Sequence, residues 1–125
     1  MTDPGTTRVV VCRVAGERFA LPIAAIREVV ATPALARLPG APEAVRGIAN
    51  VRGTLVTVVS GPALFGIRNA GSTDWLLVLS MCDGAVGLEV DEVEDVHAVG
   101  TAGRLPTLDV EALVRPLLRP EVTKL

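Results

Sequence analysis

The sequence has very few aromatic residues, a single lysine and no tyrosine. Phe19, Phe65 and Trp75 are its aromatic side chains, and Lys124 is its lysine. The core must therefore be aliphatic, and valine richness combined with 12 glycines and 9 prolines favours short β-strands over long helices. The net charge is −2, and no stretch interleaves basic and aromatic residues. This composition argues against nucleic acid as the main partner, because such binding needs clustered cations and stacking surfaces.

Signatures of catalysis are missing as well. The sequence has no glycine-rich phosphate loop and no CxxC, HExxH or GxSxG motif. The single histidine, His97, falls in an alternating strand-like run, which predicts a solvated side chain rather than a catalytic one. Cys12 and Cys82 each lie in an apolar run, which predicts two buried thiols rather than a disulfide. We therefore predict a protein that is not an enzyme and binds no cofactor.

The densest group of carboxylates spans residues 91–95, as Asp91, Glu92, Glu94 and Asp95. Successive residues of a strand point to opposite faces, so this spacing predicts a solvated acidic edge that discourages strand aggregation. The alternative is a small-molecule- or metal-binding β-barrel domain that uses this cluster near His97.

Long apolar runs are also absent. No stretch approaches the roughly 20 residues that span a bilayer, and the polar residues 1–7 do not resemble a signal peptide. We expect residues 1–7 to be a disordered leader and residues 8–125 to form a single domain. A cytoplasmic protein without membrane insertion follows from these expectations.

The pattern along the chain predicts an all-β protein with short helices. Predicted strands cover residues 8–14, 19–23, 44–49, 54–59, 74–81, 85–90 and 93–99. Between 24 and 30 the period changes, which predicts a short helix with Ile26, Val29 and Val30 on one face. A final helix is predicted over 109–118, capped by Asp109 and kinked or ended by Pro116. Residues 67–73, rich in glycine and small polar residues, are the expected boundary between two lobes.

A tight turn from Asn50 to Gly53 joins two apolar strands, and it carries Arg52. Asn and Gly tolerate positive φ, so this is favourable hairpin chemistry. A charge at such a turn is either paired or offered to a partner. Glu28 is the best candidate for pairing, whereas Ile26, Val29 and Ile48 could surround Arg52 as an apolar recognition patch. The two interpretations are compatible.

Several segments in order resemble the CheW-like family of chemotaxis adaptors. Phe19-Ala-Leu-Pro-Ile23 and Ile26-Arg-Glu-Val-Val30 are similar to an early strand and the short helix behind it. Asn50-Val-Arg-Gly53 matches the central motif, Val86-Gly-Leu-Glu-Val-Asp-Glu-Val93 a later strand, and Leu108-Asp-Val-Glu-Ala-Leu113 the closing helix.

The resemblance implies two small SH3-like β-barrel lobes that share an apolar core, without catalysis. It also implies an adaptor that couples the cytoplasmic tip of a methyl-accepting chemoreceptor to the regulatory domain of a CheA-type histidine kinase, or to another CheW-like protein, in receptor clusters. Positions that match the receptor-binding surface are Ile26, Val29, Gly47 and Arg52, supported by Glu28, Asn50 and Gly53.

The sequence departs from the family pattern in three places. Thr57 replaces a usual proline, Ser60-Gly61 replaces a usual Asp-Leu, and only about nine residues separate Val99 from Leu108. The last departure predicts a truncated second lobe and a weakened or lost kinase contact. A shortened adaptor of this kind is similar to the accessory Frz-type proteins of gliding bacteria.

Overall fold

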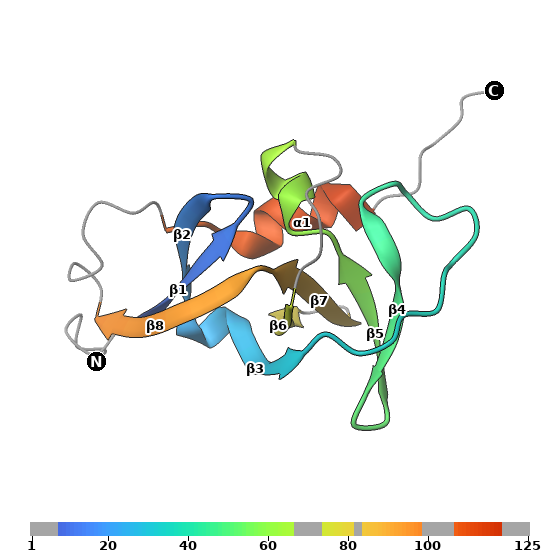
Figure 1. Cartoon of the computed structure of the whole chain (residues 1–125), viewed down its shortest axis with the longest axis horizontal. Helices are drawn as coiled ribbons and strands as arrows, with labels where there is room; N and C mark the ends of the chain where they lie inside the picture. Colours follow the sequence, from blue (N-terminus) through green and yellow to red (C-terminus); the bar gives the residue numbers. More distant parts are fainter. Residues whose placement is uncertain (1–7, 67–73, 82–83, 99–106, 119–125) are drawn as a thin grey trace.

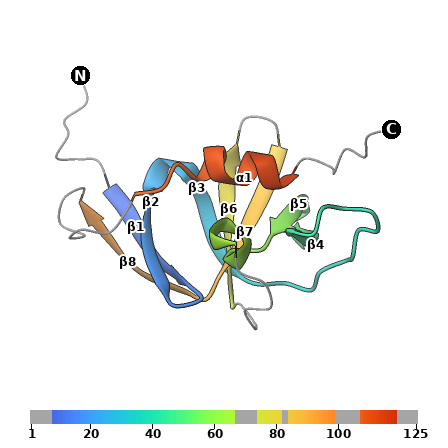
Figure 2. The same cartoon turned by 90° about the horizontal axis from the view of Figure 1, so that it is seen from above.

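Two β-sheets and one helix make up the computed structural model (Figures 1 and 2). The structure describes residues 8–66, 74–81, 84–98 and 107–118. The strands are β1 (Arg8–Val14), β2 (Glu17–Pro22), β3 (Ile26–Ala31), β4 (Val45–Val51), β5 (Thr54–Val59), β6 (Trp75–Met81), β7 (Gly84–Val90) and β8 (Glu92–Ala98). Short 3₁₀ turns, η2 (Ile23–Ala25) and η3 (Pro62–Phe65), and helix α1 (Val110–Leu118) complete the described elements. The predicted all-β class with short helices is confirmed.

The smaller sheet has the strand order β2-β1-β8 and is antiparallel throughout. Its central strand β1 is buried from Val9 to Cys12, as expected for an apolar run covered on both faces. The sheet combines the first two strands of the chain with the last one. Most of the shortened stretch before Leu108 lies outside the described residues, so the predicted truncation of the second lobe stays a prediction.

The larger sheet has the order β3-β6-β7-β5-β4, in which β5 and β7 are parallel and the other pairs antiparallel. The chain crosses from one sheet to the other at η2 and again at Asp91. The lobe boundary expected at 67–73 lies outside the described residues. The strands on either side of it, β5 and β6, belong to the same sheet, so the two sheets do not divide there.

The apolar core has two parts, and both are mainly aliphatic, as the composition predicts. The larger part lies between the two sheets and α1, and it includes Phe19, Leu77, Leu88 and Val114. The smaller part lies within the curved larger sheet and includes Val56, Val58, Leu76 and Val78. Burying each such side chain contributes about 1.5–3 kcal/mol to folding.

Helix α1 lies against the larger core on the side seen in Figure 2. The Asp109 side chain accepts a hydrogen bond from the Ala112 N–H at 3.2 Å, which confirms the predicted cap. The helix continues past Pro116 to Leu118. Val114 is buried, whereas Leu113 is 38% exposed. No helix among the described residues is long and apolar enough to cross a membrane.

The helix predicted over residues 24–30 is wrong. Only Ile23–Ala25 form a single 3₁₀ turn, and the following residues form β3, which pairs with β6. Ile26, Val29 and Val30 are β-branched and favour extended backbone, and pairing with β6 supplies the hydrogen bonds of a sheet. A seven-residue window is too short for its periodicity to separate the two structures.

Candidate functional site

The β4–β5 hairpin projects from the larger sheet and carries the predicted arginine at its tip (Figure 1). Arg52 and Gly53 have φ angles of 53° and 87°, so both central residues of this two-residue turn are left-handed, as in a type I′ turn. The Asn50 Oδ1 accepts a hydrogen bond from the Gly53 N–H at 2.8 Å. The turn is therefore held in a defined shape that presents Arg52 to solvent.

Arg52 reaches from this tip to the edge strand β3. Its Nε lies 3.3 Å from the Glu28 Oε1, so the predicted pairing is confirmed. The Arg52 side chain remains 77% exposed, whereas that of Glu28 is 28% exposed. An ion pair this exposed contributes at most about 1 kcal/mol to stability. The contact orients the guanidinium without removing it from solvent.

Strand β3 places its side chains differently from the expected helix. Val29 pairs with Leu77 and Glu28 with Val78, so Val29 and Glu28 point to opposite faces of the sheet. Val29 is 38% exposed, and Ile26 is half-buried against the larger core. β3 is the terminal strand of its sheet, and its apolar residues Ile26 and Val29 lie on the face opposite to the Arg52–Glu28 pair.

Gly47 lies beneath this surface rather than on it. The residue is buried, and a Cβ there would lie 2.5 Å from the carbonyl oxygen of Ala36. Ala36 bridges to Ile48 through two backbone hydrogen bonds of 2.8 and 2.9 Å. Gly47 thus permits the close approach of the connector to β4 and shapes the hairpin base. Its predicted contact with a partner stays a prediction.

The acidic cluster is tied to the smaller sheet. The Glu94 carboxylate accepts hydrogen bonds from Arg13 at 2.8 Å and from Arg18 at 2.7 Å. The hydrogen bond from Arg18 lowers the pKa of Glu94, with a smaller contribution from Arg13 and an opposing one from burial. The Asp91 Oδ2 accepts the Ala15 N–H at 2.8 Å. The prediction of a solvated acidic edge is therefore wrong for Glu94 and Asp91. Their carboxylates accept hydrogen bonds from β1, β2 and the turn between these strands.

Nothing in the described residues resembles a metal or reactive-thiol site. No group of three or more His, Cys, Asp or Glu side chains within the described ranges could hold a metal ion. The side chain of His97 and the whole of Cys82 lie outside the described residues. Cys12 is fully buried, and burial raises the pKa of its thiol to about 12, so it is unreactive at neutral pH.

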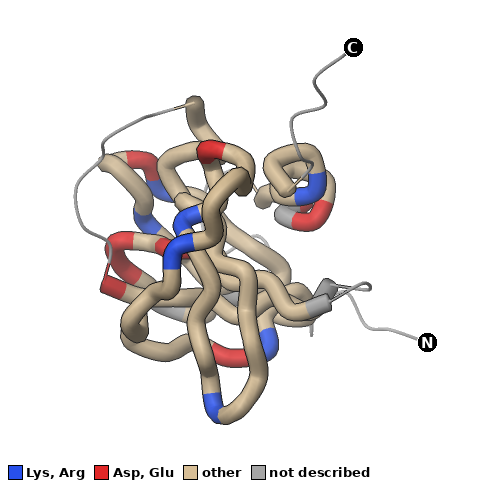
Figure 3. The backbone as a smooth tube through the Cα atoms, turned by 90° about the vertical axis from the view of Figure 1, so that its right-hand side faces the viewer, with Lys and Arg blue, Asp and Glu red and all other residues tan. Residues whose placement is uncertain are grey.

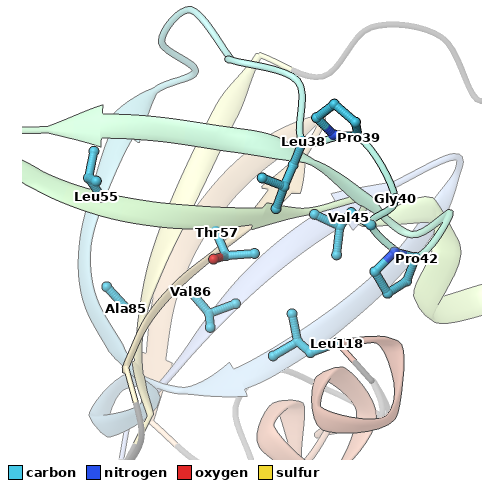
Figure 4. Close-up of a pocket in the computed structure, with 11 residues that line it drawn as sticks. Leu38, Pro39, Gly40, Pro42, Val45, Leu55, Thr57, Ala85, Val86 and Leu118 are labelled. Atoms are coloured by element: carbon cyan, nitrogen blue, oxygen red, sulfur yellow. The ribbon is translucent and has the colours of Figure 1, made fainter. Parts of the chain in front are cut away.

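A hollow of about 570 Å³ lies between the 38–42 connector, β5, β7 and the end of α1 (Figure 4). Thr57 supplies the one polar side chain of its lining, beside apolar residues such as Leu38, Val45 and Val86. Small-molecule sites need a few convergent polar groups to orient a ligand. The lining of this hollow therefore does not favour a small-molecule site there.

Two exposed apolar side chains were missed by the sequence reasoning. Leu55, beside the hairpin tip, is 67% exposed, and Trp75, at the start of β6, is 41% exposed. The backbone view of Figure 3 shows positions of Lys or Arg and of Asp or Glu interspersed along the described strands.

Comparison with known proteins gives consistent matches. The model of the CheW-like domain matches residues 8–123. A chemotaxis protein CheW of Rhizobium meliloti (strain 1021) is 31% identical over 108 residues, which cover 85% of this chain and 70% of that protein. A probable chemotaxis protein CheW of Rhizobium etli is 28% identical over 113 residues, covering 88% and 72% of the two chains.

A solved structure is similar as well. The scaffolding protein TtCheW from Thermoanaerobacter tengcongensis superimposes with a TM-score of 0.68 at 29% identity. The match covers 74% of this chain but only 65% of that protein, so this chain corresponds to about two-thirds of the scaffold's length.

Proposed function

Because this chain belongs to the CheW-like domain family, we propose that it binds the cytoplasmic tip of a methyl-accepting chemoreceptor and couples it to a CheA-type histidine kinase pathway. The family consists of scaffolding adaptors of chemotaxis and not of enzymes. An adaptor of this kind transmits a signal only if its affinity differs between receptor states.

The observation that carries the proposal is the exposed guanidinium of Arg52. It stands at the tip of a hydrogen-bonded turn, oriented by Glu28 yet 77% exposed, and the partly exposed Val29 follows Glu28 in β3. Arginine beside apolar side chains is typical of the energetic centres of protein interfaces, since its planar donor can bind a carboxylate or a carbonyl of the partner. Asn50 and Gly53 support this contact by fixing the turn.

Charge reversal at Arg52 tests the proposal. We expect Arg52→Glu to weaken binding of a purified cytoplasmic fragment of the cognate receptor by about tenfold or more, because it removes the donor and repels Glu28 and any partner carboxylate. Isothermal calorimetry measures the affinity, and circular dichroism verifies the fold.

The matched control is Arg37→Glu, which makes the same change of net charge at an exposed arginine of the connector. Its affinity for the receptor fragment should stay within about twofold of the wild type, since generic electrostatics act mainly on the association rate. Equal affinities of Arg52→Glu and the wild type would contradict the proposal.

Kinase contact is the weaker part of the proposed role. In the family both lobes carry it, whereas this chain has a shortened stretch after β8 and matches only 65% of the TtCheW chain. We therefore propose an accessory adaptor, of the Frz type, recruited to receptor clusters in the cytoplasm. Its second partner is a CheA-type regulatory domain, bound weakly, or another CheW-like protein.

A further inference from the structure

Trp75 lies on the same sheet face as Val29. The pairings of Ala31 with Trp75 and of Val29 with Leu77 are direct, so these four side chains point to one face of the β3–β6 pair. Together, Ile26, Val29, Ala31 and Trp75 form what we call the β3–β6 patch.

The β3–β6 patch is an uncovered continuation of the core. Leu77 and Leu79, on the same face of β6, are fully buried against the smaller sheet and α1. Farther along the two strands the cover ends, and Val29 and Trp75 are left 38% and 41% exposed. A half-exposed Trp next to other apolar groups is costly to leave in water and is a common energetic centre of protein interfaces.

The surroundings of the patch indicate the chemistry of its partner. From Ile26 to Ala31 the strand spans about 16 Å, which is about three turns of a helix. Arg27 is exposed and makes no ion pair with any described residue, whereas Arg52 pairs with Glu28, which points to the opposite face of β3. The occupant that fits is a helix with an apolar face and acidic residues along its flank.

We propose that Trp75 is the aromatic anchor of the receptor-docking surface, covered in the complex by the apolar face of an amphipathic receptor helix whose acidic flank faces Arg27. This inference rests on the proposed receptor binding, and it adds a contact residue from a strand that the sequence motifs do not include. It also extends the surface from the hairpin tip along the whole of β3.

The chain carries its own reporter for this contact, because Trp75 is its single tryptophan and it contains no tyrosine. The probe is a tryptophan-free cytoplasmic hairpin fragment of the cognate chemoreceptor. On titration, we expect the emission of Trp75 to shift to shorter wavelength and its quenching by acrylamide to fall. We expect Trp75→Ser to weaken binding about tenfold or more and Trp75→Phe about threefold or less.

The matched control is the variant Leu113→Ser, because Leu113 is a comparably exposed apolar residue on α1. The affinity of this variant for the receptor fragment should equal that of the wild type. Thermal melts verify that each variant folds. If the fragment binds the wild type with unchanged Trp75 emission, and Trp75→Ser binds equally well, this inference is overturned while the proposed function stands. If the fragment fails to bind the wild type at all, the proposed function falls and this inference with it.

Discussion

At the scale of single residues, Arg52 combines two opposing properties. A left-handed φ of 53° is unfavourable for a residue with a long side chain, by about 1 kcal/mol or more, and the type I′ turn would prefer Asn at this position. The exposed ion pair with Glu28 returns at most a similar amount. The arginine is therefore poorly explained by stability alone, which agrees with a role in binding.

A pair of substitutions separates the cost of the turn from the role of the charge. Arg52→Asn and Arg52→Ala both remove the guanidinium and its contact with Glu28, but only Asn tolerates the left-handed backbone. We expect Arg52→Asn to be more stable than Arg52→Ala by about 1 kcal/mol in urea denaturation. Both should bind the receptor fragment equally weakly. Identical stabilities of the two variants would show that the backbone at this turn carries no strain.

At the scale of elements, the sequence predicted those strands whose signals are local. The 54–59 strand matches β5 residue for residue, and the turn from Asn50 to Gly53 was predicted because asparagine and glycine mark it. The edge strand β3 was missed, since its structure depends on pairing with β6, some 50 residues later. The parallel pairing of β5 with β7 also has no local signature. The ion pair of Arg52 with Glu28 was predicted correctly from the residue types. Val29 and Val30 were wrongly placed on one face, because that prediction assumed a helix in place of β3.

The ion pairs of the smaller sheet predict a pH dependence. The folded-state pKa of Glu94 is lowered, chiefly by the hydrogen bond from Arg18, so the stabilisation is fully present above the unfolded pKa of about 4.3. It is lost as the pH falls through the lower folded value. We expect the wild type to exceed Glu94→Gln in free energy of unfolding by a constant amount between about pH 6 and 8. The difference should shrink progressively below about pH 4.3.

Urea denaturation at a series of pH values measures this difference. In an Arg18→Met background, the difference in free energy of unfolding between the protein with Glu94 and its Glu94→Gln variant should decrease less on acidification. The reason is that the main cause of the lowered pKa of Glu94, the hydrogen bond from Arg18, has been removed. A difference between the wild type and Glu94→Gln that is independent of pH down to about pH 3 would refute the assignment.

At the scale of the whole molecule, the two sheets are built from interleaved parts of the chain. Residues 26–90 supply the larger sheet, with the hairpin, Glu28 and the β3–β6 patch, and the two flanking parts supply the smaller one. The surface proposed for the receptor therefore lies mainly on a sheet that the short stretch after β8 leaves intact. The kinase contact that the family resemblance implies is expected to need the other lobe as well.

This division predicts unequal affinities for the two partners. We expect the purified chain to bind the receptor fragment but to bind the regulatory domain of the cognate CheA-type kinase weakly or not at all. Calorimetric titration of both partners with the same preparation makes the comparison, and the receptor titration serves as the control for active protein. Micromolar or tighter binding of the kinase domain would contradict the prediction.

The position of β1 between β2 and β8 has a consequence for synthesis on the ribosome. β1 emerges before both of its neighbours, and the neighbour on its second side, β8, is translated roughly eighty residues later. During that interval the run from Val9 to Cys12 has an open hydrogen-bonding edge and uncovered valines, which is the type of segment that aggregates. The nascent chain is thus open to aggregation at β1 until β8 emerges, and chaperones that bind apolar segments would act there.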